Sequence, residues 1–344
     1  MTERRFSTRA RATAVGAALT APIVPWFGAL AQPATPEATV EARYGGMTVA
    51  QIAGVKADQR YKLLAVLKTL ANEYWQAMKQ GYEGAATEKG VAIDVVSVTT
   101  EQDSEEQLTL LQQKLNEGYA AVMVSPITSV NLIPGLVTAT ARHIPIINVD
   151  EKIDAEAAEE AGVEITSVIA SDNKQVGAEA AKYMIAAIPN GGKVAVIEGK
   201  AGNPSGQDRH DGFVDTIEAA GSFTVAASQP ADWDRARALD AAASILQANP
   251  DTVGFYACND TMALGVVEAV KAAGKAGKIV VIGTDGIPEA LDAVRSGDLA
   301  GTVAQYPAET ARIATSLAIL ALQGKPIEDF IPSPIKLLTK ADVR

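Results

Sequence analysis

The chain has 344 residues, 48% of them hydrophobic and 21% charged, which is enough for about two globular domains. Its formal net charge of -11 argues against a nucleic-acid-binding protein, which needs a basic surface. The single cysteine, Cys258, excludes an intramolecular disulfide, and we expect it to be buried because it ends an apolar run. His143 and His210 have no cysteine neighbours, so we predict neither a metal site nor a cofactor.

The amino terminus has the composition of an export signal. Four arginines precede a mostly apolar or small-residue stretch at 12–30, and 29–31 match a small-x-small cleavage site. We therefore predict a signal peptide at 1–31 and a mature chain that begins at Gln32. Pro22 and Pro25 weaken the alternative of a retained membrane helix without eliminating it. The expected location is the periplasm or the outer face of the cell membrane, and the export route, Sec or twin-arginine, stays open.

Strand-like and helix-like segments alternate from residue 61 onward. Before them, 32–60 is predicted to be a linker or leader, within which 47–52 is apolar enough to pack as a short helix or strand. The predicted strands are 63–67, 91–98, 120–124, 144–149, 165–170, 194–197, 223–226, 253–256, 279–282 and 299–304. The predicted helices are 74–88, 105–117, one that ends near 142, 174–188, 205–220, 234–248, 260–273, 287–296 and 307–323. For 151–164, a β-hairpin or antiparallel excursion is an option that the pattern does not place.

Short loops between continuous apolar strands favour parallel sheets that helices cover on both faces. Ten strands are many for one such sheet, so we predict an α/β fold of two lobes. The loops at the carboxyl ends of parallel strands converge on one crevice. In the second half of the chain, polar residues stand at or after these ends, and Gln305 closes the series. They are Arg209, Trp233, Asn259 and Asp285. A guanidinium, an indole, a carboxamide and a carboxylate in one crevice would suit a small polyol.

Similar candidates follow the first strand of the first half. Lys68 ends that strand, and Asn72 precedes the first helix, where it would also serve as a cap. Tyr74 and Trp75 would present ring faces in the crevice, although Trp75 also fits the core stripe of its helix. Aromatic rings suit the apolar C–H faces of a pyranose, whose hydroxyls need polar partners at the edge.

Several candidates have a structural alternative that the sequence leaves open. Asp150 and Glu151 would accept hydrogen bonds from vicinal hydroxyls, or they would belong to a charged surface loop. Arg209 would form an exposed ion pair. Asn259 and Asp285 would each cap the following helix. Trp233 is different, because its acidic flanks are an odd setting for a core residue and favour ring stacking.

The remaining motifs argue against catalysis. The glycine-rich stretch 199–206 lacks the residue order of a phosphate loop, and Pro204 interrupts it. The segment 171–173 indicates a helix cap and stands between the two halves, where a hinge would lie. No serine–histidine–acid constellation or nucleophile elbow is visible, so we predict a binding protein rather than an enzyme.

From about Leu63 to its end, the chain resembles the periplasmic type I sugar-binding proteins of bacterial ABC importers, the ribose-binding family. The matching stretches are Val66-Leu67-Lys68-Thr69-Leu70, 148–154, 197–203, 227–235, Asn259-Asp260-Thr261-Met262-Ala263 and Gly283-Thr284-Asp285-Gly286-Ile287-Pro288. The resemblance implies two similar parallel-sheet lobes joined by a hinge of three crossings, near 170–171, 305–306 and 332–333. The implied N-terminal lobe is 61–170 plus 306–332, and the C-terminal lobe is 171–305 plus 333–344.

The resemblance also implies a ligand set. The carried-over residues are Lys68, Asn72, Tyr74, Trp75, Asp150, Glu151, Arg209, Trp233, Asn259, Asp285 and Gln305. Ribose binders have arginine where Glu151 stands, which favours a hexose-type site. The family often has proline at the position of Glu73 and phenylalanine at that of Tyr74, so this pocket differs there.

The function implied is that of a monomeric receptor that captures a monosaccharide, such as D-allose or a ribose-like sugar, and delivers it to a membrane permease. A sugar receptor for a chemotaxis or sensor-kinase system is the alternative, and its ligand site would look the same. An intracellular sugar-responsive repressor would need a DNA-binding helix pair, whereas residues 1–60 offer a signal-like segment.

Overall fold

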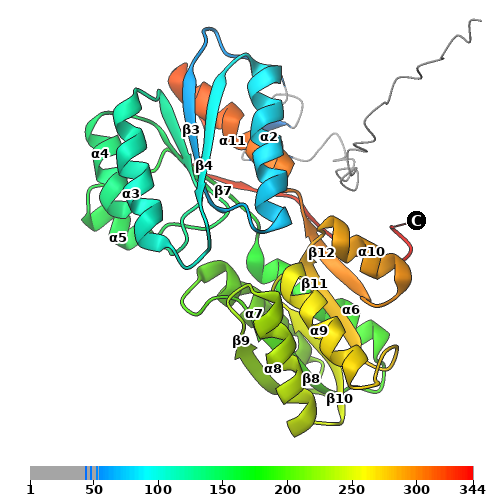
Figure 1. The fold of residues 1–344 in the computed structure, drawn as a ribbon. Helices are drawn as coiled ribbons and strands as arrows, with labels where there is room; N and C mark the ends of the chain where they lie inside the picture. Colours follow the sequence, from blue (N-terminus) through cyan, green and yellow to red (C-terminus); the bar gives the residue numbers. More distant parts are fainter. Residues whose placement is uncertain (1–42, 45–46, 49–51, 53, 344) are drawn as a thin grey trace, which may run out of the picture. The chain divides into compact units, whose positions relative to one another are not determined.

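The computed structural model describes residues 43–44, 47–48, 52 and 54–343. The predicted signal peptide lies outside these residues. The first elements of the described residues are two short strands, β1 (Arg43–Tyr44) and β2 (Met47–Thr48), which pair in antiparallel fashion. The rest of the described chain forms two six-stranded sheets with helices on both faces (Figure 1). The predicted α/β class is confirmed, and we call each sheet with its helices a lobe.

The N-terminal lobe contains a wholly parallel sheet in the order β13-β7-β6-β5-β3-β4. Its strands are β3 (Lys62–Thr69), β4 (Ala92–Val98), β5 (Ala121–Val124), β6 (Ile146–Val149), β7 (Ser167–Ala170) and β13 (Phe330–Pro332). Helices α2 (Glu73–Lys89) and α11 (Pro307–Leu322) pack together on one face. The other face carries α3 (Ser104–Lys114), the 3-10 turn η1 (Leu115–Glu117), α4 (Ile133–Ala141) and α5 (Ala155–Glu160) (Figure 1).

Strand β3 shows why the apolar run became a central strand. Its side chains alternate between the faces, so Leu63 and Leu67 join the core under α2 and α11, while Leu64 joins the core under α3 and α4. All three are fully buried. A strand covered on both faces needs an unbroken apolar sequence, which is the pattern that predicted a parallel sheet.

The C-terminal lobe contains a sheet in the order β14-β12-β11-β10-β8-β9. Its strands are β8 (Gly192–Glu198), β9 (Phe223–Pro230), β10 (Thr252–Ala257), β11 (Val280–Asp285), β12 (Gly301–Gln305) and β14 (Ile335–Thr339). All pairings are parallel except that of β12 with β14. Its helices are α6 (Asn173–Ala187) against α7 (Pro204–Ala219), α8 (Arg235–Ala248) against α9 (Asp260–Ala272), and α10 (Pro288–Ser296) beside α9.

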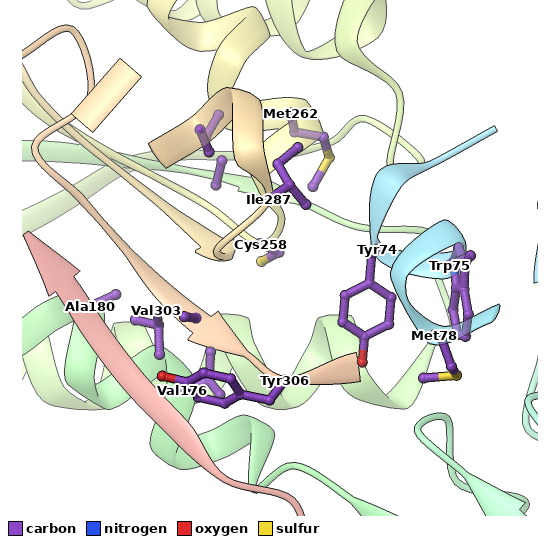
Figure 2. Close-up of a cluster of buried hydrophobic side chains, with 14 of the residues drawn as sticks. Tyr74, Trp75, Met78, Val176, Ala180, Cys258, Met262, Ile287, Val303 and Tyr306 are labelled. Carbon is purple, nitrogen blue, oxygen red and sulfur yellow. The ribbon is translucent and has the colours of Figure 1, made fainter. Parts of the chain in front are cut away.

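Figure 2 shows part of the buried hydrophobic cluster that runs through both lobes. Trp75 and Met78 project from α2, and Tyr306 follows the end of β12. Cys258 is fully buried after β10, as the sequence predicted. None of the helices in the described part of the chain is long and apolar enough to cross a lipid bilayer.

Two local expectations need correction. Residues 151–164 form no hairpin, because Asp154 caps the short helix α5 by accepting a bond from Ala157 N. Strands β13 and β14 were not predicted. At the end of the predicted leader, the packing allowed for 47–52 is seen at Ile52, whose carbonyl accepts a bond from Ser316 on α11, and it extends to Val55, which is 8% exposed.

Candidate ligand-binding site

The two lobes enclose a cavity at the carboxyl ends of their strands. Its empty volume is about 350 Å³, which includes the open solvent at its mouth. We call it the central cavity. It is lined by Lys68, Asn72, Tyr74, Trp75, Glu101, Asp150, Glu151, Ser205, Arg209, Trp233, Asn259, Asp285 and Gln305. The structure therefore brings all eleven predicted residues together, and it adds Glu101 and Ser205.

The first turn of α2 supplies the aromatic side of the N-terminal lobe. The Oδ1 atom of Asn72 accepts a 2.9 Å bond from the backbone N of Tyr74, so Asn72 caps the helix and also lines the cavity. Tyr74 and Trp75 meet edge to face, with ring centroids 5.0 Å apart. Trp75 donates from Nε1 to Oε1 of Glu101 at 3.0 Å. This bond fixes the indole edge, so the ring orientation is set before any ligand arrives.

Lys68 is a buried cation with acidic neighbours. Its Nζ lies 2.9 Å from Oε2 of Glu151, 4.0 Å from Oε2 of Glu101 and 5.5 Å from the centroid of the Trp75 ring. Burial lowers the pKa of Lys68, but the carboxylates of Glu151, Glu101 and Asp150 together outweigh burial, so the pKa is raised and the lysine stays charged. Lys68 therefore remains a donor at the cavity wall.

Asp150 is an acceptor held in an unusual backbone conformation. It follows β6 with a positive φ of 68°, and its backbone N donates to the carbonyl of Ile169 at 2.8 Å. The hydroxyl of Tyr74 donates to its Oδ1. Burial raises the pKa of Asp150, while Lys68 and the Tyr74 hydroxyl oppose the shift. With Glu151 only 1% exposed as well, the surface-loop alternative for this acidic pair is wrong.

Arg209 on α7 is the corresponding cation of the C-terminal lobe. It is 5% exposed, so the exposed-ion-pair alternative is wrong. Its Nε donates to Oδ1 of Asn173 and its Nη1 to the carbonyl of Cys258, both at 2.8 Å. Nη1 also lies 3.8 Å from Oδ1 of Asp285. Because the two acceptors lie on different parts of the fold, α6 and the residue after β10, the two hydrogen bonds hold the guanidinium plane in place.

Asp285 ends β11 with a φ of 125° and does not cap α10, whose cap position is Ile287. Gln305 donates from Nε2 to Oδ1 of Asp285 at 2.8 Å. Burial raises the pKa of Asp285 to about 7, although Arg209 and Gln305 oppose the shift. Behind it, the buried carboxylate of Asp260 accepts bonds from the backbone N atoms of Gly286 and Ile287, which fixes the loop that carries Asp285.

Trp233 lies in the loop between β9 and α8, again with a positive φ, here 65°. A Cβ atom at Gly199 would overlap the indole of Trp233, so the ring can lie where it does only because residue 199 has no side chain. In the described chain, three of the five non-glycine residues with positive φ line the central cavity: Asp150, Trp233 and Asp285. Backbone strain of this kind persists where the surrounding structure enforces it, often at functional sites.

Asn259 caps α9, because its Oδ1 accepts a 2.8 Å bond from the backbone N of Met262. The cap was the structural alternative, and it leaves the carboxamide nitrogen available at the cavity. Asp172 likewise caps α6, as predicted, while its neighbour Asn173 orients Arg209.

Within the described residues, the buried Nε1 of Trp233 and Oε1 of Gln305 have no hydrogen-bond partner. Buried polar atoms usually have partners, so both are suited to meet ligand hydroxyls or water.

Sequence reasoning missed Glu101 and Ser205 for different reasons. Glu101 follows β4, and the strand-end rule that found Asp150 would also have found it. Ser205 stands in the glycine-rich stretch, which we considered only as a phosphate loop. Asn203 caps α7 by accepting from Gly206 N, and Pro204 is its first residue, a recognisable helix start.

The fold and the site define a class: a two-lobed α/β binding protein with a buried, polar and aromatic-walled cavity between its lobes. In the described part of the chain, no group of three histidine, cysteine, aspartate or glutamate residues is arranged to hold a metal ion. Residues 64–326 match the family model described as "Periplasmic binding protein domain". The chain belongs to this family.

Named relatives agree with this assignment. The chain is 42% identical over 267 residues to the D-allose-binding periplasmic protein of Escherichia coli, covering 77% of this chain and 86% of that protein. It is 32% identical over 274 residues to the ribose import binding protein RbsB of Bacillus subtilis, covering 80% and 86%. These relatives are binding proteins, and the chain belongs to a class of transport proteins rather than enzymes.

A solved structure shows the same architecture. The ABC transporter periplasmic solute-binding protein of Actinobacillus succinogenes, solved with bound D-allose, aligns with a TM-score of 0.80 at 33% identity. The alignment covers 83% of this chain and 99% of that one. The resemblance to sugar-binding proteins that the sequence indicated is therefore confirmed.

Proposed function

We propose that this protein is the substrate-binding component of an ABC importer, and that it captures a monosaccharide such as D-allose or a ribose-like sugar in the central cavity. One observation carries the proposal: two lobes place aromatic faces, buried cations and buried carboxylates around one cavity. The D-allose relative and the structure with bound D-allose support this choice of ligand.

The wall chemistry suits a neutral polyol. The rings of Tyr74, Trp75 and Trp233 offer apolar faces to the C–H surfaces of a sugar ring. Asp150 and Asp285 accept bonds from its hydroxyls. Hydrogen-bond donors for the sugar oxygens come from Lys68, Asn72, Arg209, Asn259 and Nε1 of Trp233, and Oε1 of Gln305 is a further acceptor. Lys68, Arg209, Asn259, Asp285 and Gln305 are buried, so a sugar that fails to pair one of them would lose roughly 1–3 kcal/mol of binding free energy.

We further propose that 61–170 with 306–332 and 171–305 with 333–344 move as two bodies. The strand order supports this, since the chain leaves the first sheet after β7, returns after β12 and leaves again after β13. Sugar binding would favour the arrangement in which the lobes meet, and the permease would recognise that arrangement. Residues 1–31 would direct export to the periplasm, and the mature protein would act as a monomer.

The test is isothermal titration of the chain from Gln32 onward against a panel of pentoses, hexoses and inositols. We expect one sugar to bind with one-to-one stoichiometry. Asp285→Ala should abolish this binding while the protein stays folded, because it removes an acceptor from a buried polar wall. Failure of every sugar, or an unchanged affinity in Asp285→Ala, would contradict the proposal.

A further inference from the structure

Glu151 is surrounded by protein donors from both lobes. Within the N-terminal lobe, Lys68 donates to its Oε2 at 2.9 Å. From the C-terminal lobe, Asn203 donates from Nδ2 to the same oxygen. Ser205 donates to Oε1 twice, from its backbone N at 3.2 Å and from its hydroxyl at 3.1 Å.

These four bonds use the whole acceptor capacity of the side chain. An ionised carboxylate offers about four lone-pair sites. Glu151 is 1% exposed, and its partners Lys68, Asn203 and Ser205 are 3%, 2% and 6% exposed. A sugar hydroxyl could therefore bind Glu151 only by displacing a buried protein donor, although Glu151 lines the central cavity.

The partner surface is a helix start that suits an anion. Asn203 is the N-cap of α7, and Ser205 belongs to its first turn. The helix has 16 residues, and its first turn presents the backbone N–H of Ser205 and the positive end of the helix dipole to the carboxylate. A second contact lies nearby, because Lys200 donates from Nζ to the backbone carbonyl of Glu101 at 2.8 Å.

We propose that Glu151 is a latch between the lobes rather than a sugar ligand, a positioning residue that acts through the first turn of α7. This inference rests on the proposed function. With the lobes together, the carboxylate has four donors; with the lobes apart, only Lys68 remains. Because a sugar in the central cavity leaves only when these contacts break, the latch sets the dissociation rate of the sugar.

Two substitutions test the latch from either side. Glu151→Gln removes the negative charge and places an amide N–H donor opposite the donors of Lys68, Asn203 and Ser205, with which it cannot form a hydrogen bond. Asn203→Asp keeps an oxygen that caps α7 but replaces the Nδ2 donor with a second oxygen facing Glu151. The double variant, Glu151→Gln with Asn203→Asp, moves the carboxylate from residue 151 to residue 203. Lys68 therefore keeps an acidic neighbour. Glu156→Gln is the matched control, since Glu156 is an exposed glutamate on α5 of the same lobe.

The first readout is the dissociation rate of D-allose, followed by stopped-flow tryptophan fluorescence because Trp75 and Trp233 line the cavity. We expect each single variant to release the sugar on the order of 10- to 100-fold faster, as expected for lost hydrogen bonds to a charged group. The double variant should recover a large part of the loss, and the control should equal the wild type. A loss in Glu151→Gln alone, with no effect of Asn203→Asp and no rescue, would identify Glu151 as a direct sugar ligand and overturn the latch.

The second readout needs no sugar. The backbone N–H of Ser205 donates to Glu151, so hydrogen exchange of the peptide containing Ser205 reports the contact directly. Exchange should be faster in either single variant than in the wild type. A wild type that binds no sugar would refute the proposed function while leaving this measurement valid. Equal exchange in wild type and variants, without D-allose and with it, would refute the latch.

Discussion

Replacing Gly199 with alanine should weaken sugar binding by displacing the indole of Trp233. A Cβ atom at Gly199 would overlap Cη2 and Cζ2 of the ring, well inside van der Waals contact. The indole is rigid and its backbone is already held at a φ of 65°, so the ring must tilt as a whole. Alanine suits the local backbone, because Gly199 does not adopt a positive φ. The protein should therefore fold, with the damage concentrated at the cavity wall.

The expected size follows from overpacking in a well-packed interior, which typically costs about 1–3 kcal/mol. If that cost falls on the sugar-bound state, Kd rises about 5- to 150-fold. Gly206→Ala should have a smaller effect, since its Cβ would lie 3.2 Å from the same ring atoms. Gly84→Ala, on α2, is the control, because its Cβ would lie 3.4 Å from the flexible Nη2 atom of Arg312 on α11.

Titration calorimetry with D-allose measures Kd for each variant, and tryptophan fluorescence reports the environment of the ring. In a Trp233→Ala background, Gly199→Ala should have little further effect, because the two substitutions act on one contact. Full affinity in Gly199→Ala, or additive losses in the double variant, would refute the view that Gly199 seats a sugar-stacking Trp233.

Three further predictions follow from the cavity wall. The folded-state pKa of Asp285 is raised from 3.8 to about 7, so its contribution to stability is present in full below pH 3.8 and is lost as the pH rises through about 7. Urea denaturation should show that Asp285→Asn gains up to about 3 kcal/mol relative to wild type between pH 5 and pH 8, and an equal pH dependence would contradict this assignment. Tyr74→Phe removes the hydroxyl that donates to Asp150, which raises the pKa of Asp150 further. Titration should find a loss of affinity that is larger at pH 5 than at pH 8, and a loss independent of pH would argue against this coupling. Arg209→Lys cannot keep both hydrogen bonds, to Asn173 and to the Cys258 carbonyl, so we expect at least about tenfold weaker sugar binding by calorimetry. Wild-type affinity in this variant would show that only the charge matters.

Much of the fold could be predicted because its signals are local. Each central strand is a short, continuous apolar run. The helices α2 and α7 each begin directly after a capping asparagine, which is Asn72 for α2 and Asn203 for α7. Strands β13 and β14 were missed because their partners, β7 and β12, lie far away in the sequence. The helix α5 was missed although its signals were present: Asp154 followed by a run of alanine and glutamate.

The sequence by itself determined the fold class and most of the residues that line the central cavity, because side chains at the carboxyl ends of parallel strands must converge. Only the tertiary structure decided what surrounds each of them there. The sequence predicted Glu151 as a sugar acceptor, but only the structure shows that Asn203 and Ser205 of the opposite lobe donate to its two oxygens. The sequence left open whether Arg209 lines the crevice or forms an exposed ion pair, and its bonds to Asn173 and the Cys258 carbonyl exclude the exposed alternative. Burial, pKa and hydrogen-bond saturation depend on atoms that distant segments bring together, so no local pattern contains them.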